Sequence, residues 1–220
     1  MQNNSLWSDA LRRLLANRAA MISAVILILL ILSAIFAPFI ATHSYAYQNL
    51  SLGATAPSAE HFLGTDTLGR DLFSRILYGA RVSLMVGFVA TFVALIIGVT
   101  WGIIAGYYGG RIDSIMMRIV DILYGLPFVI FIILLMVIFG RNIWLLFAAI
   151  GAVEWLTMAR IVRAQVITIK GLEYVQAAQA LGVPNNRLFI RHIFPNILGP
   201  IAVYATLTIP QVMLLEAFLS

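Results

Sequence analysis

The sequence contains no cysteine and few charged residues. Without cysteine the chain forms no disulfide, has no thiol nucleophile and offers no thiolate metal ligand. Only 10% of its residues are charged and 62% are hydrophobic, whereas a soluble domain is about a quarter charged and about half apolar. One soluble core cannot hide that much apolar surface. We therefore expect an integral membrane protein whose apolar side chains face lipid or other spans.

The sequence also lacks the residue patterns that several kinds of functional site require. The only lysine, Lys170, does not follow a glycine-rich phosphate-binding loop. His43, His61 and His192 are far apart in the sequence and lack metal-ligand spacing, so we expect loop or interfacial positions for them. The thirteen arginines are scattered at the ends of hydrophobic runs, which argues against nucleic acid as a partner. We predict no catalytic residue, no metal site and no cofactor bound by this chain.

Long apolar runs supply the expected fold class, an all-α polytopic membrane helix bundle. A helix needs about 20 apolar residues to cross the hydrocarbon layer, and five segments meet that length. The predicted spans are 19–41, about 82–107, 120–139, 142–160 and 197–220. Within the second, Gly98, Gly102 and Gly106 recur every four residues, and we expect this stripe to let another helix pack closely.

Arginine and lysine near the spans indicate the orientation. With the N-terminus in the cytoplasm, ten of these residues lie inside and four outside, which satisfies the positive-inside rule. Residues 1–18 are then cytoplasmic. Their apolar residues have helical spacing, so we expect a short interfacial helix there: Leu6, Trp7, Ala10, Leu11, Leu14 and Leu15. Residues 42–80 form an outer segment, and 81–220 form the core of the bundle.

The inner segment, residues 161–196, contains two predicted short helices, which a simple connection between two spans would not need. An alanine-rich run over 172–181 is followed by Gly182 and Pro184, a typical helix stop. Asn185 or Asn186 is expected to cap a second short helix, which Pro195 closes before the last span. We interpret this helix–turn–helix as a docking surface for a cytoplasmic partner.

Three acidic residues lie at or near membrane depth. Glu154 interrupts the fourth predicted span, Glu216 the fifth, and Asp121 begins the third. Because charge in hydrocarbon is costly, these side chains should face the bundle interior or water. For Glu154 and Glu216 both interhelical hydrogen bonding and pathway lining remain open. Asp121 is expected to pair with Arg118.

The inner segment resembles the ATPase-docking loop of bacterial ABC importer permeases. In that family Glu-Ala-Ala is followed, after three residues, by Gly and, after nine more, by Ile-x-Leu-Pro. The matching positions here keep this spacing, with Gln176 in place of the usual Glu: Gln176, Ala177, Ala178, Gly182, His192, Ile193, Phe194 and Pro195. Gln carries no charge, so it cannot form a charge-assisted pair with the ATPase at this position. Glu173, one helical turn earlier, can supply the negative charge instead.

The outer segment narrows the resemblance to permeases of peptide and nickel importers. Asp71 is expected to cap a short helix and to pair with Arg75. The residues similar to the family motif are Gly64, Asp66, Gly69, Arg70, Asp71 and Arg75. Stretches such as 17–20, 83–87 and 158–163 are closest to the C-type permease of oligopeptide importers.

The resemblance implies an ATP-driven importer that moves oligopeptides from the periplasm to the cytoplasm across the bacterial inner membrane. Its expected partners are a homologous second permease, two cytoplasmic ATPase subunits that bind ATP and Mg²⁺, and a periplasmic peptide-binding protein. Such permeases have a type I bundle with six spans, so we expect a truncated chain that lacks the last one. The alternatives are a dipeptide or nickel importer of the same family and, from another class, an ATP-independent channel or secondary transporter.

Overall fold

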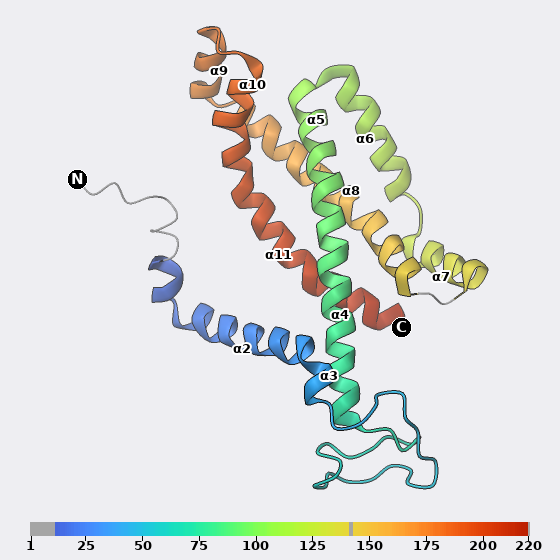
Figure 1. The fold of residues 1–220 in the computed structure, drawn as a ribbon. Helices are drawn as coiled ribbons and strands as arrows, with labels where there is room; N and C mark the ends of the chain where they lie inside the picture. Colours follow the sequence, from blue (N-terminus) through green and yellow to red (C-terminus); the bar gives the residue numbers. More distant parts are fainter. Residues whose placement is uncertain (1–11, 141–142, 220) are drawn as a thin grey trace. The chain divides into compact units, whose positions relative to one another are not determined.

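The computed structural model describes residues 12–140 and 143–219, and over these ranges it is helical apart from turns, loops and one isolated β-bridge (Figure 1). The expected all-α fold class is confirmed. The chain divides into two compact units, Met1–Leu84 and Met85–Ser220. Each unit has its own internal packing and is described separately.

The N-terminal unit begins with an apolar helix, α2, over Arg18–Ile35. The Asn17 side chain caps it by accepting a hydrogen bond from the Ala20 amide at 3.2 Å. Ile22 and Leu29 are 62% and 60% exposed, as suits a helix surrounded by lipid. A short helix, α3, follows over Ala37–Ile40. Of the predicted interfacial helix, Leu6, Trp7, Ala10 and Leu11 lie outside the described residues, while residues 12–16 are helical.

Residues 41–71, here called the outer loop, form turns without a regular helix and lead into α4, Leu72–Ala94. A π-helical turn over Leu95–Val99 joins α4 to α5, Thr100–Tyr108, so that one helical stretch continues from residue 72 to residue 108. It ends where Gly109 adopts φ +65°, a conformation that glycine reaches without strain.

In the C-terminal unit, α8 (Ile143–Lys170) packs against both α5 and α11 (Phe194–Leu219). The glycine stripe explains the close contact with α5. A Cβ atom at Gly98 would lie 2.6 Å from the Met158 Cβ atom, and one at Gly102 would lie 2.5 Å from the Ala159 carbonyl oxygen. The prediction that the stripe permits close helix packing is confirmed, and α8 is the partner helix.

The third predicted span, 120–139, is not a single helix. Helix α6 runs over Gly110–Tyr124 and α7 over Phe128–Phe139, with a turn between them. Pro127 explains the interruption, because its ring disfavours helical geometry at the preceding residue and it has no amide hydrogen to donate. The twelve residues of α7 extend about 18 Å at 1.5 Å per residue. That is shorter than the roughly 30 Å hydrocarbon layer.

Three helices in the described part of the chain are long and apolar enough to cross a membrane: Arg18–Ile35, Leu72–Tyr108 and Asn185–Phe218. They correspond to the first, second and fifth predicted spans. Residues 143–160 of the fourth predicted span lie within α8, whose second half carries Arg160, Arg163 and Lys170. Membrane crossing by 120–139 and by 142–160 stays a prediction.

The inner segment folds as α9, Glu173–Ala180, and α10, Asn185–Leu188. The expectation that Asn185 or Asn186 caps α10 is wrong, because extended Pro184 occupies the N-cap position and accepts the Arg187 and Leu188 amides. The expectation that Pro195 closes the second helix is also wrong. A π-helical turn over Phe189–Ile193 links α10 directly to α11. This wider turn carries the helix into Pro195, which lies in the first turn of α11.

Candidate functional site

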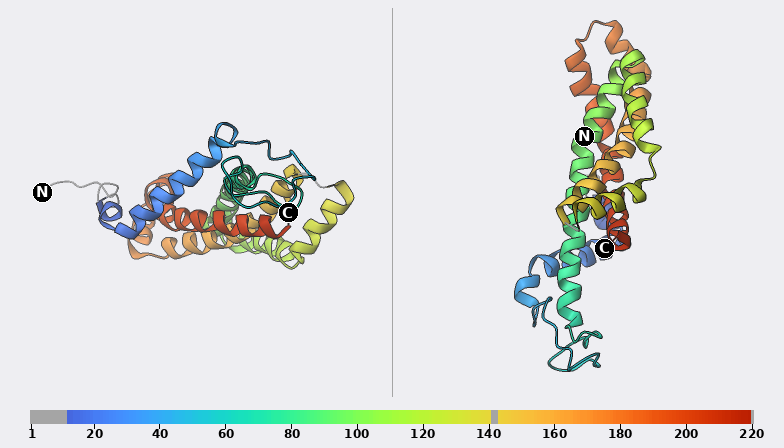
Figure 2. Two further views of the ribbon diagram at one scale, coloured as in Figure 1. Left: turned by 90° about the horizontal axis from the view of Figure 1, so that it is seen from below. Right: turned by 90° about the vertical axis from the view of Figure 1, so that its right-hand side faces the viewer.

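The predicted docking loop, residues 161–196, places α9 and α10 at one end of the C-terminal unit, next to the ends of α8 and α11 (Figures 1 and 2). Helix α9 has two distinct faces. Val175 is fully buried, and Ala178 packs partly buried against the cluster that contains it. Glu173, Gln176 and Ala177 are exposed. The loop therefore presents a short helix whose outer face is free of contacts with the unit's core.

The turn after α9 fixes the direction in which the chain leaves this helix. Gly182 has φ +77°, its amide donates to the Gln179 carbonyl at 3.0 Å, and the Val183 amide donates to the Ala178 carbonyl at 3.1 Å. These two bonds form a Schellman motif, which satisfies helix-end carbonyls. Leu181, just before the glycine, is 85% exposed. An unusually exposed apolar side chain thus stands at the tip of the loop.

Gln176 makes a contact that an ionised glutamate could not make. Its Nε2 atom donates a hydrogen bond to the Gly171 carbonyl oxygen at 3.2 Å, at the turn that follows α8. A carboxylate has no donor for this oxygen. The departure from the family's usual residue therefore ties α9 to the end of α8. Exposed Glu173 lies in the first turn of α9, where a negative charge favours the helix dipole.

Tyr107 and Lys170 anchor the docking loop to the end of α5. The Lys170 Nζ atom donates to the Tyr107 carbonyl at 2.6 Å and lies 5.4 Å from the centre of the Tyr107 ring. The Tyr107 hydroxyl donates to the Asn185 carbonyl at 3.3 Å, and its ring contacts that of Phe189 edge-on. Tyr107, at the end of α5, thus contacts α8, α10 and the π-helical turn over Phe189–Ile193.

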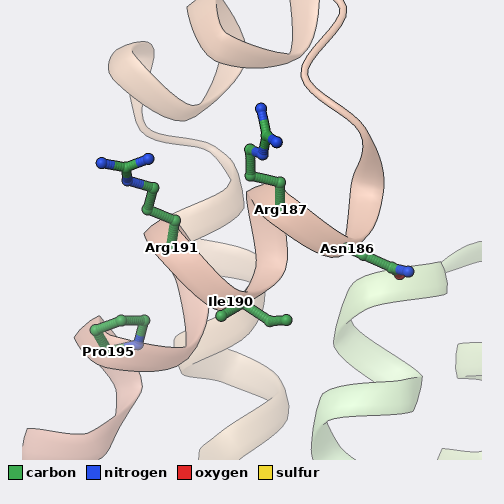
Figure 3. Close-up of a pocket in the computed structure, with 5 residues that line it drawn as sticks. All are labelled: Asn186, Arg187, Ile190, Arg191 and Pro195. Atoms are coloured by element: carbon green, nitrogen blue, oxygen red, sulfur yellow. The ribbon is translucent and has the colours of Figure 1, made fainter.

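An open depression of about 530 Å³ lies beside α10. Arg187 and Arg191, four residues apart, extend in the same direction, whereas Asn186 points toward the neighbouring helix (Figure 3). Ile190 is 67% exposed and contributes apolar surface, and Pro195 completes the lining. The docking loop therefore combines exposed apolar side chains with positive charge.

The deep acidic residues have different surroundings. Glu154 in α8 is only 6% exposed. Glu216 in α11 is 7% exposed. Both side chains are buried in the C-terminal unit. Whether either one lines a pathway stays a prediction.

The expected pairing of Asp121 with Arg118 is wrong. The Asp121 Oδ1 atom instead accepts a hydrogen bond from Arg160 Nη2 at 2.7 Å, and the Arg160 guanidinium lies 4.2 Å from the centre of the Tyr124 ring. The packing of α6 against α8 brings Arg160 within reach. A contact between helices thus replaces the local pair three residues away.

Sequence reasoning missed a second ion pair between the same helices. Arg163 contacts both carboxylate oxygens of Asp113, with Nη2 donating to Oδ2 at 2.5 Å and Nε donating to Oδ1. Such bidentate geometry is the strongest form of this pair. The partners are fifty residues apart, so no local spacing indicated them.

The family motif of the outer loop is organised around Asp66. Its carboxylate accepts the Leu68 and Arg70 amides at 2.9 and 3.0 Å, Arg70 Nε at 2.7 Å and Arg75 Nη1 at 2.5 Å. Loss of solvation raises the pKa of this group, but the four donors outweigh it and lower the pKa to about 2. Asp66 therefore stays ionised and holds the turn to the first part of α4.

Asp71 caps α4, as predicted, because its Oδ2 accepts the Ser74 amide at 2.8 Å. The predicted Asp71–Arg75 pair is wrong, since Arg75 binds Asp66. The capping geometry turns the Asp71 carboxylate toward His61, whose Nδ1 atom lies 3.0 Å from Oδ1. Loss of solvation raises the pKa of Asp71, but hydrogen bonds from Ser74 and His61 lower it below its usual value.

Two motif glycines occupy positions that a side chain could not. Gly64 and Gly69 have φ values of +77° and +67°. A Cβ atom would lie 2.3 Å from the Thr55 carbonyl oxygen at Gly64 and 1.9 Å from the Asn49 carbonyl oxygen at Gly69. Both contacts are impossible, so the motif requires glycine there. The structure thus assigns the outer motif an architectural role, with all six predicted residues in or next to one network.

The structure also brings together two histidines that are separated in the sequence. The ring centroids of His43 and His61 lie 4.6 Å apart. Glu60 lies beside them, and ligand atoms of the three side chains are all within 4.8 Å of one another. Sequence spacing did not indicate this cluster, because residues 43 and 60 approach only through the turns of the outer loop.

Comparison with known proteins identifies relatives along the whole chain. Residues 98–220 match the family described as the binding-protein-dependent transport system inner membrane component. Residues 5–57 match the N-terminal transmembrane domain of oligopeptide transport permease C.

Individual relatives agree with these matches. The oligopeptide transport system permease protein OppC of Haemophilus influenzae is 45% identical over 100% of this chain and 71% of its own length. OppC of Escherichia coli is 47% identical over 100% of this chain and 74% of its own. The dipeptide transport system permease protein DppC of Bacillus subtilis is 47% identical over 98% of this chain and 68% of its own. This chain therefore belongs to the family of binding-protein-dependent transport system inner membrane components.

Proposed function

We propose that this chain is a transmembrane permease subunit of an ATP-driven importer that moves oligopeptides from the periplasm to the cytoplasm. Whole-chain similarity to oligopeptide permeases supports the transport function. The proposal that the permease is coupled to an ATPase rests on the exposed outer face of α9. The buried inner face of this helix holds it at the end of the C-terminal unit. A separate ATPase subunit docks on this face.

The anchoring of the loop supplies a route for the coupling. Helix α9 follows α8 after a short turn and is tied to it by Gln176. On its other side the Schellman turn leads into the continuous stretch α10–α11. A displacement of α9 by the ATPase is thus passed to two long helices, and Tyr107 couples the same movement to α5.

The proposed assembly contains a homologous second permease, two cytoplasmic ATPase subunits and a periplasmic peptide-binding protein. ATP and Mg²⁺ bind to the ATPases and not to this chain. The N-terminus and the docking loop lie in the cytoplasm, and the outer loop lies in the periplasm. The bias of arginine and lysine toward the docking side supports this orientation in the inner membrane.

A dipeptide importer is the second candidate, because DppC of Bacillus subtilis is as similar as OppC of Escherichia coli, both at 47% identity. Uptake of labelled dipeptides and pentapeptides by the reconstituted transporter distinguishes the two. Preferential pentapeptide uptake supports the oligopeptide assignment. Uptake restricted to dipeptides replaces it with the second candidate.

Leu181→Glu tests the docking surface. Leu181 is 85% exposed and precedes the Gly182 turn, so the change places a charge on the proposed interface without removing a buried contact. We expect the ATPase to co-purify less and peptide uptake to fall at least tenfold, while the amount of permease in the membrane is unchanged. Leu50→Glu is the matched control, because Leu50 is 72% exposed in the outer loop.

Normal ATPase co-purification together with normal uptake in Leu181→Glu contradicts docking at this face. Equal losses in Leu181→Glu and Leu50→Glu also contradict it, because they would reflect a general effect of added charge. Uptake that persists without ATP and depends on an ion gradient contradicts the importer assignment itself.

A further inference from the structure

The outer loop contains a cluster of side chains that the proposed transport function does not use. His43, Glu60 and His61 line a pocket of about 260 Å³ together with Tyr47, Asn49, Leu52 and Gly69. We propose that His43, Glu60 and His61 form a binding site for a divalent transition-metal ion of the Zn²⁺ type. The site lies wholly within the N-terminal unit and is separate from the docking loop.

The distances allow the three side chains to bind one ion. Their ligand atoms lie within 4.8 Å of one another. Bonds of about 2.0–2.1 Å in a tetrahedral Zn²⁺ site place neighbouring ligand atoms about 3.3 Å apart. The cluster must therefore contract modestly on binding. Glu60 is exposed and His43 is 29% exposed along its side chain, so both can adjust without displacing a packed core.

Asp71 prepares His61 for this role. Its carboxylate is only 1% exposed and accepts a hydrogen bond from His61 Nδ1 at 3.0 Å. A histidine that donates Nδ1–H to a carboxylate has Nε2 available as a metal ligand, and the carboxylate fixes the orientation of the ring. Asp71 is in turn held by the Ser74 amide at the start of α4. The carboxylate that orients the His61 ring is thus already held in position.

The ligand types select the class of ion. Two imidazoles and one carboxylate suit Zn²⁺ and similar transition metals, whereas Ca²⁺ and Mg²⁺ require mainly oxygen ligands. Three protein ligands leave a fourth coordination position for water or another small ligand. Because the chain has no cysteine, thiolate ligands do not compete for the ion.

A bound ion would connect parts of the outer loop that the backbone leaves distant. His43 follows α3 shortly after its end, whereas Glu60 and His61 precede the Gly64–Asp71 motif. The ion would close the chain between residues 43 and 60 and link this closure, through Asp71, to the cap of α4. Because it binds the folded loop, it stabilises the loop in proportion to its concentration relative to its dissociation constant.

Zn²⁺ titration of the purified full chain in detergent tests the site. We expect saturable binding with a stoichiometry of one, measured by calorimetry or by competition with a chromogenic chelator. His43→Gln and Glu60→Gln should each weaken binding by at least about tenfold. His192→Gln removes an imidazole from the other unit and is the matched control, with unchanged affinity. His43 meets the cap of α4 through its backbone amide, which donates to the Ser74 hydroxyl at 3.2 Å, and its Nδ1 atom lies 4.0 Å from the Asp71 Oδ1 atom. His43→Gln keeps that backbone bond and the Asp71–Ser74 cap, so both variants should fold.

Three results would overturn the proposal: no saturable Zn²⁺ binding by the unaltered chain, unchanged affinity in both His43→Gln and Glu60→Gln, or an equal loss in His192→Gln. Hydrogen exchange gives a second measurement on the same samples. At a Zn²⁺ concentration near the dissociation constant of the unaltered chain, Zn²⁺ should slow exchange in residues 42–71 of the unaltered chain much more than in Glu60→Gln. Equal slowing in the two chains at that concentration also contradicts the assigned ligands.

Discussion

At the scale of single residues, Asp66 shows how one carboxylate can organise a loop. Four hydrogen bonds from two backbone amides and two arginines converge on it. The local part of this arrangement follows from sequence, because aspartate commonly accepts amides two to four residues ahead in turns. The contact with Arg75 does not, since the sequence favoured Asp71 as its partner.

The outer loop should lose structure in acid. The pKa of Asp66 is about 2, below its usual 3.8, so folding of the loop is favoured by ionisation. This contribution is complete above the usual pKa and is lost as pH falls from about 4 through 2. Hydrogen exchange of residues 64–71, corrected for intrinsic rates, should show protection declining over that range.

Asp66→Asn is the control for this titration. The amide cannot ionise, so protection should be lower at neutral pH and should not fall further because of residue 66. An equal pH-dependent decline in the unaltered chain and in Asp66→Asn would show that another group is responsible. Asp71, whose pKa is also lowered, is the nearest such group.

At the scale of elements, helix packing follows the sequence where small residues recur and departs from it near proline. The stripe of Gly98, Gly102 and Gly106 predicted a close contact, which α8 supplies. Pro195 was expected to end a helix, yet a π-helical turn carries the helix into it. Such a turn has no distinct sequence signal, because ordinary helix-forming residues make it up.

Gly102→Ala should destabilise the packing of α5 against α8. The added Cβ atom would lie 2.5 Å from the Ala159 carbonyl oxygen and 2.8 Å from the Val162 Cβ atom, so the helices must separate. We expect a loss of about 1–3 kcal/mol, typical of an overpacked core, measured by thermal unfolding in detergent. Gly79→Ala is the control, because no atom lies within 4 Å of its added Cβ.

Gly79→Ala should raise stability by about 0.5–1 kcal/mol, since alanine loses less backbone entropy in a helix. A neutral effect of Gly102→Ala, or equal effects of the two substitutions, would contradict the close approach of α5 and α8. The comparison separates packing from helix propensity, because both glycines are helical and both gain the same methyl group.

At the scale of the whole chain, composition predicted a membrane protein and the long apolar runs predicted helices, and the all-α fold class is confirmed. The N-cap of α4 and the stop after α9 were also predictable, because both depend on residues within one turn. The ion pairs of Asp113 with Arg163 and of Asp121 with Arg160, and the His43–His61 cluster, were not. Each of these contacts joins residues at least eighteen positions apart.

Single-cysteine labelling tests the five-span arrangement, and the cysteine-free chain needs no background substitutions. Leu50→Cys should react with an impermeant reagent in intact cells, whereas Leu181→Cys should react only after permeabilisation. If residues 120–139 and 142–160 both cross the membrane, Asn142→Cys is labelled from outside.

Labelling of Asn142→Cys only after permeabilisation would limit the described part of the chain to its three clearest spans. Residues 109–184 would then all lie on the cytoplasmic side. Labelling of Leu181→Cys in intact cells would reverse the proposed orientation. Ile112→Cys, 46% exposed in α6, provides an independent check on the cytoplasmic side.

The small size of α9 has a consequence for inhibitor design. The helix has only eight residues, whereas isolated helices shorter than about 12–15 residues are marginal in water. Its shape depends on the burial of Val175 and on the turn at Gly182. A linear peptide copying residues 172–183 would therefore be largely unfolded and a weak competitor for the ATPase. A mimic would need a covalent brace on its inner face to replace the support that the protein gives.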